Sequence, residues 1–228
     1  MPVEQRDVVP STGELGRGGE TPRARSDHHD SHEHDATRED GSMSDLPHPT
    51  MPAPDASVRR ARPADTAAIA ALTLASWRAQ PSDLLPVDAL AAVEVADVAA
   101  EWLEAVAAPP SRRHVVLVAL EGDDVVGYVL LAPSQDPDSD GASGEVADLV
   151  IRDDRTRRGH GSRLLAAAVD TLREVGTAEL LMWVAAGDDV RLAFLASAGL
   201  AADGASRTLD GGPGTAALRQ VRWSARID

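Results

Sequence analysis

The chain has 228 residues and a net charge of −15, with 37 acidic against 22 basic side chains. Such an acidic surface repels phosphate backbones and anionic lipid headgroups, which argues against nucleic acid and membranes as partners and favours cationic ones. The absence of cysteine excludes disulfides, thiolate nucleophiles and cysteine-ligated metals. Neither an 18-residue apolar window nor a basic, apolar secretory leader is present, and we therefore expect a cytoplasmic protein.

The first 55 residues differ in composition from the rest of the chain. Gly, Pro, Ser, His and acidic residues fill this segment, so too little apolar surface is available to offset the entropy of ordering it. We predict a disordered tail over residues 1–55 and one folded domain over residues 56–228. Four tail histidines lie among carboxylates, at His28, His29, His32 and His34. Loose metal coordination is one reading of this run, but no scaffold fixes its geometry; a disordered polar leader is the better reading, and no metal is expected.

Apolar periodicity divides residues 56–228 into alternating strands and helices. A strand is predicted at 57–62, and Pro63 to Asp65 then begin a helix. Helical spacing predicts a second helix from Asp88 to Ala107. Further strands are expected at 114–120, 125–131, 145–151, 179–185, 200–209 and 216–223, further helices at 158–175 and 188–198, and a mobile loop at 133–144. This order predicts an α/β fold whose mixed sheet carries helices on both faces, with a ligand at the strand that feeds the 158–175 helix.

The turn after strand 145–151 carries the strongest chemical signal. Its sequence Arg-Arg-Gly-His-Gly-Ser, at 157–162, opens a strongly apolar helix. Free backbone N–H groups and the positive end of the helix dipole suit a pyrophosphate, and glycine permits close approach. Glycine at a helix start also serves ordinary turns and caps, but the preceding strand and a local excess of positive charge favour an anion site. That charge comes from Arg155, Arg157, Arg158 and Arg163.

The run at 148–165 resembles the signature of the GNAT superfamily of acyl-CoA-dependent N-acetyltransferases. In that signature an apolar strand and a short turn precede Gln or Arg, two residues, Gly, one residue, and Gly or Ala at a helix start. The similarity extends over most of residues 57–228, including 58–65, 125–128 and 193–200. The resemblance implies the GNAT fold, a mostly antiparallel mixed sheet with a V-shaped split and helices on both faces. It also implies acetyl-CoA as co-substrate, without a metal.

By the same resemblance, the backbone of residues 149–151 would run beside the pantetheine arm, and one amide would polarise the thioester carbonyl. The glycine turn would bind the pyrophosphate. Thr156 stands where the signature has Gln or Arg, with Arg155 and Arg157 beside it to supply charge. Asp188 stands where many members have Asn. The residues expected to contact the cofactor are Leu149, Val150, Ile151, Thr156, Arg157, Arg158, Gly159, His160, Gly161, Ser162, Asp188 and Phe194.

Attack of an amine on a thioester needs a neutral nucleophile, which a carboxylate can provide by removing a proton. Glu145 stands where some family members place a general base and is the first candidate; a plain role at the strand start is the alternative. Asp148 is the weaker candidate, and two-residue alternation places it on the face opposite Glu145 unless a bulge intervenes. His160 would face solvent or phosphate, and Tyr128 would pack in the core. Leu195 replaces a tyrosine that often protonates the departing thiolate, which would leave unassisted or recover a proton from water or product.

The predicted activity is transfer of an acetyl group from acetyl-CoA to a primary amine of a small molecule or peptide, by direct attack in a ternary complex. The acidic charge favours a cationic acceptor, and homodimers are common in the family. The alternative is a catalytically degenerate module that binds acyl-CoA or a protein partner without turnover, which Thr156 and Leu195 favour. Glu145 and the glycine turn favour the enzyme.

Overall fold

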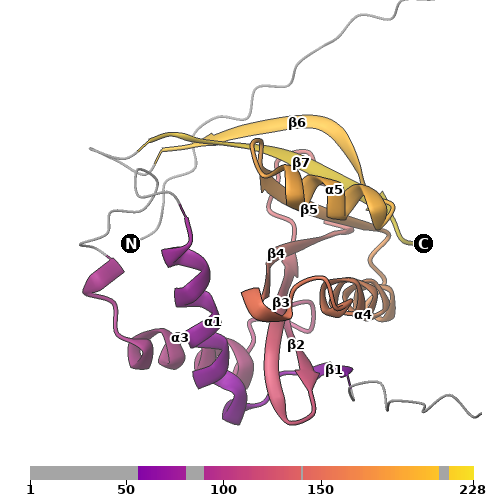
Figure 1. The fold of residues 1–228 in the computed structure, drawn as a ribbon. Coiled ribbons are helices and arrows are strands. Elements are labelled where there is room, and N and C mark those ends of the chain that lie inside the picture. Colours follow the sequence, from indigo (N-terminus) through magenta and orange to yellow (C-terminus); the bar gives the residue numbers. More distant parts are fainter. Residues whose placement is uncertain (1–55, 81–89, 140, 211–215) are drawn as a thin grey trace, which may run out of the picture. The chain divides into compact units, whose positions relative to one another are not determined.

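The computed structural model describes residues 56–80, 90–139, 141–210 and 216–228, so the expected tail and its histidines lie outside the described part. Within these ranges a seven-stranded sheet forms the centre of the domain, in the order β1-β2-β3-β4-β5-β7-β6 (Figure 1). Every neighbouring pair is antiparallel except β4 with β5, which confirms the predicted mixed sheet. The strands are β1 (Ala56–Arg60), β2 (Val115–Glu121), β3 (Asp124–Pro133), β4 (Ser143–Ile151), β5 (Glu179–Ala185), β6 (Ala201–Leu209) and β7 (Leu218–Arg226).

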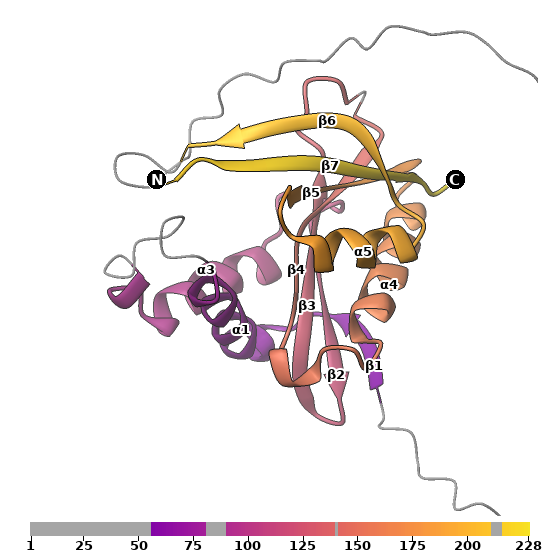
Figure 2. The same ribbon diagram turned by 45° about the horizontal axis from the view of Figure 1, so that its top comes forward.

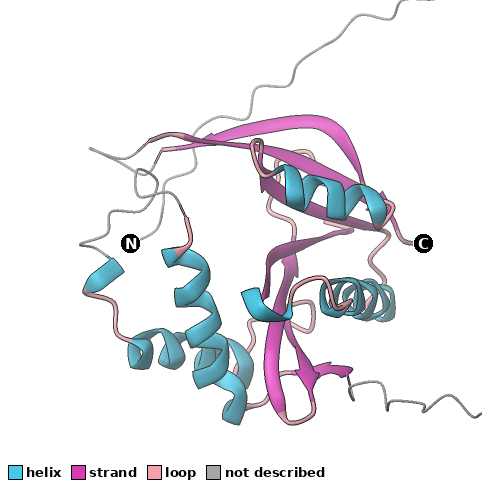
Figure 3. Cartoon of the chain, viewed as in Figure 1, coloured by secondary structure: helices cyan, strands magenta, loops and turns pink. Residues whose placement is uncertain are grey.

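Helices cover both faces of the sheet, as predicted (Figure 2). Helices α1 (Thr66–Arg78) and α3 (Val95–Ala107) pack on one face, where Ile69 and Leu72 meet Val118 and Tyr128. Helices α4 (His160–Glu174) and α5 (Asp189–Ser197) pack on the other, against the Val and Leu side chains of β2 to β5 (Figure 3). None of the helices that the structure describes is long and apolar enough to cross a membrane.

The expected single helix from Asp88 to Ala107 is wrong because it is interrupted: residues 90–91 are helical, but residues 92–94 are not. Helix α3 begins at Val95, because Glu94 before it has an extended backbone with φ −83° and ψ 142°. Residues 81–89 lie outside the described part. The apolar spacing that suggested one long helix therefore continues across an interruption in the backbone.

The loop expected at 133–144 is shorter and more firmly held than its polar composition suggests. Strand β3 extends to Pro133 and β4 begins at Ser143. Within the loop, the buried Asp136 accepts hydrogen bonds from Trp183 Nε1 at 3.1 Å and from Arg222 Nη1 at 2.9 Å. These two bonds tie the loop to β5 and β7.

Strands β4 and β5 separate soon after they meet. Their parallel pairing joins only residues 143–145 to 179–181, whereas β4 continues to Ile151 and β5 to Ala185. Beyond Glu145 the edge of β4 that faces β5 has no strand partner there. This divergence is the V-shaped split that the sequence led us to expect, and it opens toward the glycine turn at the start of α4.

Gly127 lets β3 and β4 approach closely beside this split. A Cβ at position 127 would stand 2.5 Å from Cδ1 of Ile151 and 2.7 Å from the carbonyl oxygen of Val150. The second contact is with backbone, so a change of side-chain rotamer cannot relieve it. Any larger residue at this position must push the two strands apart.

We expect Gly127→Ala to lower the free energy of unfolding by about 1–3 kcal/mol, the usual cost of overpacking, as measured by urea denaturation. Gly187→Ala is the matched control, because a Cβ there would meet nothing within 4 Å. Equal stability of the two variants would contradict the close approach at Gly127.

Candidate active site

The turn that leads into α4 is shaped to hold an anion. Arg157 has φ 61° and Gly159 has φ 82°, so two left-handed residues bend the chain within three positions. Arg163 is the first helical residue whose N–H bonds to a backbone carbonyl, that of Gly159 at 3.0 Å. The N–H groups at 160–162 are those that a helix start leaves free. A left-handed non-glycine residue costs free energy, and such strain clusters at ligand sites.

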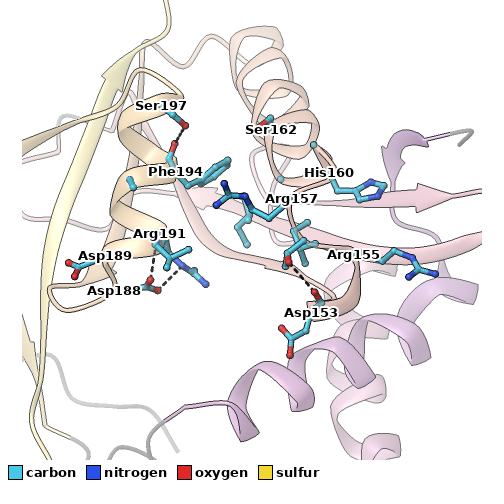
Figure 4. A pocket seen from close by; sticks show the side chains of 17 residues that line it. Asp153, Arg155, Arg157, His160, Ser162, Asp188, Asp189, Arg191, Phe194 and Ser197 are labelled. Atoms are coloured by element: carbon cyan, nitrogen blue, oxygen red, sulfur yellow. Dashed lines mark hydrogen bonds and ion pairs between the residues drawn. The ribbon is translucent and has the colours of Figure 1, made fainter. Parts of the chain in front are cut away.

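A cavity of about 880 Å³ lies between the C-terminal end of β4, this turn and α5 (Figure 4). It brings together ten of the twelve residues predicted to contact the cofactor. These are Leu149, Ile151, Thr156, Arg157, Gly159, His160, Gly161, Ser162, Asp188 and Phe194. Val150 and Arg158 are not among its lining residues: Val150 packs in the core on the α1 side, and Arg158 pairs with Glu121 at 3.1 Å.

The arginines around the turn have different roles. Glu121 on β2 forms ion pairs with both Arg155, at 2.5 Å, and Arg158, and Asp154 also pairs with Arg155 at 2.8 Å, so both guanidinium groups are already held by carboxylates. The side chain of Arg157 instead turns into the cavity toward Phe194 (Figure 4). Arg157 is therefore the arginine beside Thr156 that is placed to meet a bound anion.

The expectation that His160 faces solvent or phosphate is wrong. Its ring is only 2% exposed and points away from the cavity (Figure 4). Burial lowers the pKa of this imidazole, so the neutral form is favoured, and its Nε2 has no hydrogen-bond partner. His160 is thus a lining residue of the cavity whose imidazole is turned away from it (Figure 4).

Helix α5 forms the opposite wall of the cavity. The carboxylate of Asp188 caps this helix by accepting a hydrogen bond from the N–H of Arg191 at 2.9 Å. Phe194 covers Gly161, where a Cβ would come within 3.5 Å of the phenyl ring. Leu195 is completely buried in the core and does not line the cavity.

A bulge in β4 corrects the predicted orientation of the two candidate carboxylates. In the pairing with β3, Leu130 opposes Asp148 but Leu131 opposes Val146, so Ala147 is an extra residue. Val146 and Leu149 both enter the core beside α4, which places Glu145 and Asp148 together on the opposite face. Simple alternation would have separated them; the inserted residue reverses that outcome.

Asp148 is held by the only tyrosine of the chain. The Tyr128 hydroxyl donates to Asp148 Oδ2 at 2.6 Å and lies 3.0 Å from Thr73 Oγ1, which accepts a hydrogen bond from Trp102 Nε1 at 3.0 Å. Tyr128 is completely buried, as predicted, and burial together with the Asp148 charge raises the pKa of its phenol. Its proton is thus committed to Asp148.

Glu145 is placed differently. Among the described residues no group lies within hydrogen-bond distance of its half-buried carboxylate. Burial raises the pKa of this carboxyl, Arg207 and Arg222 oppose the rise, and Asp136 adds to it. Such a carboxylate is closer to the ideal of a general base than an exposed one.

A second cavity of about 740 Å³ lies on the other side of β4, against α1. It shares Ile151, Asp153 and Arg191 with the first cavity, so the two meet at the end of β4. Arg191 is the shared cation, and its Nε lies 3.3 Å from Asp188. The sequence pattern does not single out Arg191; its only signal is that it is the one basic residue of α5.

Among the described residues, no group of three or more His, Asp or Glu could hold a metal ion.

The sequence matches a family model and two curated proteins. The model is that of the acetyltransferase (GNAT) family, and it matches residues 77–200. An uncharacterized N-acetyltransferase, YuaI of Bacillus subtilis, is 26% identical over 128 residues, which cover 56% of this chain and 70% of that protein. A mycothiol acetyltransferase of Thermomonospora curvata is 45% identical over 82 residues, which cover 36% of this chain and only 24% of that protein.

Solved structures share the fold. The protein yncA of Salmonella typhimurium, solved with its cofactor acetyl-CoA, has a TM-score of 0.61 at 20% identity, over 76% of this chain and 95% of that one. A ribosomal-protein-alanine N-acetyltransferase of Brucella melitensis has a TM-score of 0.60 at 23% identity, over 75% of this chain and 99% of that one. With the family match over residues 77–200, the split sheet and the glycine turn, the chain belongs to the GNAT acetyltransferase family.

Proposed function

We propose that the protein transfers an acetyl group from acetyl-CoA to a primary amine. The observation that carries this proposal is the cavity between β4 and α5, which ends at the anion-holding turn. The donor set fits the cofactor: free N–H groups at the start of α4, and the Arg157 guanidinium, suit a pyrophosphate. The related fold of yncA was solved with acetyl-CoA, and the Brucella relative is named for acetylation of an alanine amine.

The split between β4 and β5 supports the placement of the acyl group. Residues 149–151 lie beyond the last parallel pair, so one edge of β4 is free to run beside the pantetheine arm. Leu149 and Ile151 line the cavity. A backbone N–H on this edge would donate to the thioester carbonyl and stabilise the oxyanion that forms during attack.

Glu145 is the general base in this proposal. The lone pair of the amine attacks the thioester carbonyl carbon, the amine proton passes to Glu145 directly or through water, and the C–S bond then breaks. Leu195 is buried and Tyr128 donates to Asp148, so neither protonates the leaving sulfur. The CoA thiolate leaves as such and takes its proton from water or from Glu145; a thiol pKa of about 8.5 makes this departure feasible.

We expect Glu145→Gln to lower kcat by about 10²- to 10⁴-fold, the usual contribution of a general base. A base must be ionised, so wild-type kcat should rise with pH through the pKa of Glu145, which burial places above that of an ordinary carboxyl. The measurement is kcat against pH, with thiol release followed on saturating acetyl-CoA and amine. In Glu145→Gln this fall of kcat at low pH, the acid limb of the profile, should be absent.

The variant Asp148→Asn tests which of the two carboxylates, Glu145 or Asp148, is the general base. We expect it to retain the acid limb, since Asp148 is already engaged by Tyr128. Loss of the limb in Asp148→Asn, with its retention in Glu145→Gln, would assign the base to Asp148 instead. Acetyl-CoA binding without thiol release on any amine would contradict the enzyme and leave the degenerate module.

Gly159 and Gly176 form a matched pair for the anion site. Both have a left-handed backbone, with φ 82° and 77°, and they lie at opposite ends of α4. Alanine at either position costs about 1–2 kcal/mol of backbone strain. We expect only Gly159→Ala to weaken acetyl-CoA binding, by tenfold or more in calorimetry, because only there does the strained residue shape the turn. Equal affinity of the two variants would count against pyrophosphate binding at this turn.

A further inference from the structure

The face of the sheet opposite α5 carries a charged cluster between β4, β5, β6 and β7. Leu180, Met182 and Val184 of β5 enter the core beside α5, so Trp183 points to the opposite face. In the strand register Trp183 lies beside Arg222, and Arg207 lies beside Gln220. Glu145 lies beside Leu181, two residues before Trp183 on β5.

Most of the hydrogen-bonding capacity of Arg222 is used within this cluster. Its guanidinium bonds to Asp136 at 2.9 Å, to Asp138 at 2.5 and 2.7 Å, and to Asp203 at 2.7 Å. These three carboxylates hold the pKa of Arg222 above its ordinary value against the opposing effect of burial. Arg222 therefore fixes the 134–139 loop and β6 against β7, and four of its five N–H donors are already used by carboxylates.

The guanidinium of Arg207 is held in one orientation, but not all of its N–H groups have hydrogen-bond acceptors among the described residues. Its guanidinium carbon lies 4.4 Å from the centre of the Trp183 ring, and its Nε donates to Gln220 Oε1 at 2.7 Å. Among the described residues, neither Nη group has a hydrogen-bond acceptor. Stacking and one hydrogen bond thus fix the plane of the guanidinium and leave its outer edge free. That edge is the one that binds a carboxylate with two parallel bonds.

Glu145 supplies the opposite charge beside Arg207. The two groups attract each other electrostatically, yet no hydrogen bond joins them. A half-buried carboxylate without a hydrogen-bond partner among the described residues and a half-buried guanidinium with free Nη groups there match a ligand with one positive and one negative group. The acidic charge of the chain explains why a ligand would carry a positive group, but it does not explain the negative group.

We propose that the acetyl acceptor is an amino acid, a primary amine that carries its own carboxylate. Its amine lies at Glu145 and its carboxylate binds the Nη edge of Arg207 above Trp183. This inference rests on the proposed acetyl transfer, and it narrows the predicted cationic acceptor to a zwitterionic one. Arg207 then determines specificity without taking part in the proton transfer.

The experiment compares each amino acid with its own amide, which keeps the amine and removes the negative charge. The full-length protein is assayed with acetyl-CoA and a panel of L-amino acids and L-amino acid amides, and thiol release gives kcat and KM. Hydrogen bonds to charged groups contribute about 1.5–3 kcal/mol, so kcat/KM should be about 10- to 100-fold higher for the preferred amino acid than for its amide.

Arg207→Gln should abolish this preference by raising KM for the amino acid more than for the amide, with both substrates assayed at a pH high enough to ionise Glu145 without the Arg207 charge. Arg207→Lys, which keeps the charge but not the paired donors, should retain part of the preference. Arg219→Gln is the matched control, because this exposed arginine neighbours Gln220 in the sequence and so points from β7 to the other face. Acetyl-CoA affinity, measured on each variant, checks that the fold is intact.

The outcomes separate the two proposals. Equal kcat/KM for amino acids and amides in the wild type, or a preference that survives Arg207→Gln, would overturn the inference and leave acetyl transfer standing. Thiol release with neither class but with another primary amine, such as a polyamine or a peptide, would overturn the inference alone. Acetyl-CoA binding without thiol release on any of these amines would overturn the acetyl transfer and the inference together.

Discussion

The whole site depends on how briefly β4 and β5 stay together. A parallel ladder of three residues on each strand joins the antiparallel half of the sheet, β1 to β4, to the half formed by β5, β7 and β6. Had the ladder continued to Ile151, no space would exist between β4 and α5, and the edge of β4 would have its hydrogen bonds filled. The bulge at Ala147 belongs to the same constraint, since it turns Glu145 and Asp148 to one face just where the strands part.

Positive charge is gathered locally in a protein whose overall charge is negative. In a chain of net charge −15, Arg155, Arg157 and Arg158 lie together at the turn before α4, and Glu121 pairs with the first and the third. Positive charge is thereby concentrated on Arg157 and on the backbone N–H groups rather than spread over the surface. A similar arrangement holds on the other face of the sheet, where three aspartates bind Arg222 and leave Arg207 as the cation that interacts with Glu145.

The sequence predicted the elements and the anion-holding turn because their signals are local. Glycines at a helix start, an apolar strand before them and helical spacing after them are all contained in residues 145–175. The orientation of Glu145 and Asp148 could not be predicted in this way, because the bulge arises from pairing with β3. The burial of His160 depends on the sheet beneath α4, and the stacking of Arg207 on Trp183 joins strands whose register no sequence pattern reveals. Long-range pairing therefore decides the arrangement around Glu145 and Arg207, and local sequence decides the glycine turn before α4.

The network around Tyr128 has an optical consequence. The tyrosine ring lies 5.0 Å from the indole of Trp102, close enough for the excited phenol to pass its energy to the indole. The fluorescence of the chain is therefore that of its tryptophans, and Trp102 connects through Thr73 and Tyr128 to Asp148 on the central strand. A ligand that alters the hydrogen bond at Asp148 changes the surroundings of this indole. Trp102 is thus an intrinsic fluorescent reporter, built into the fold, of events at the strand that bears both candidate carboxylates.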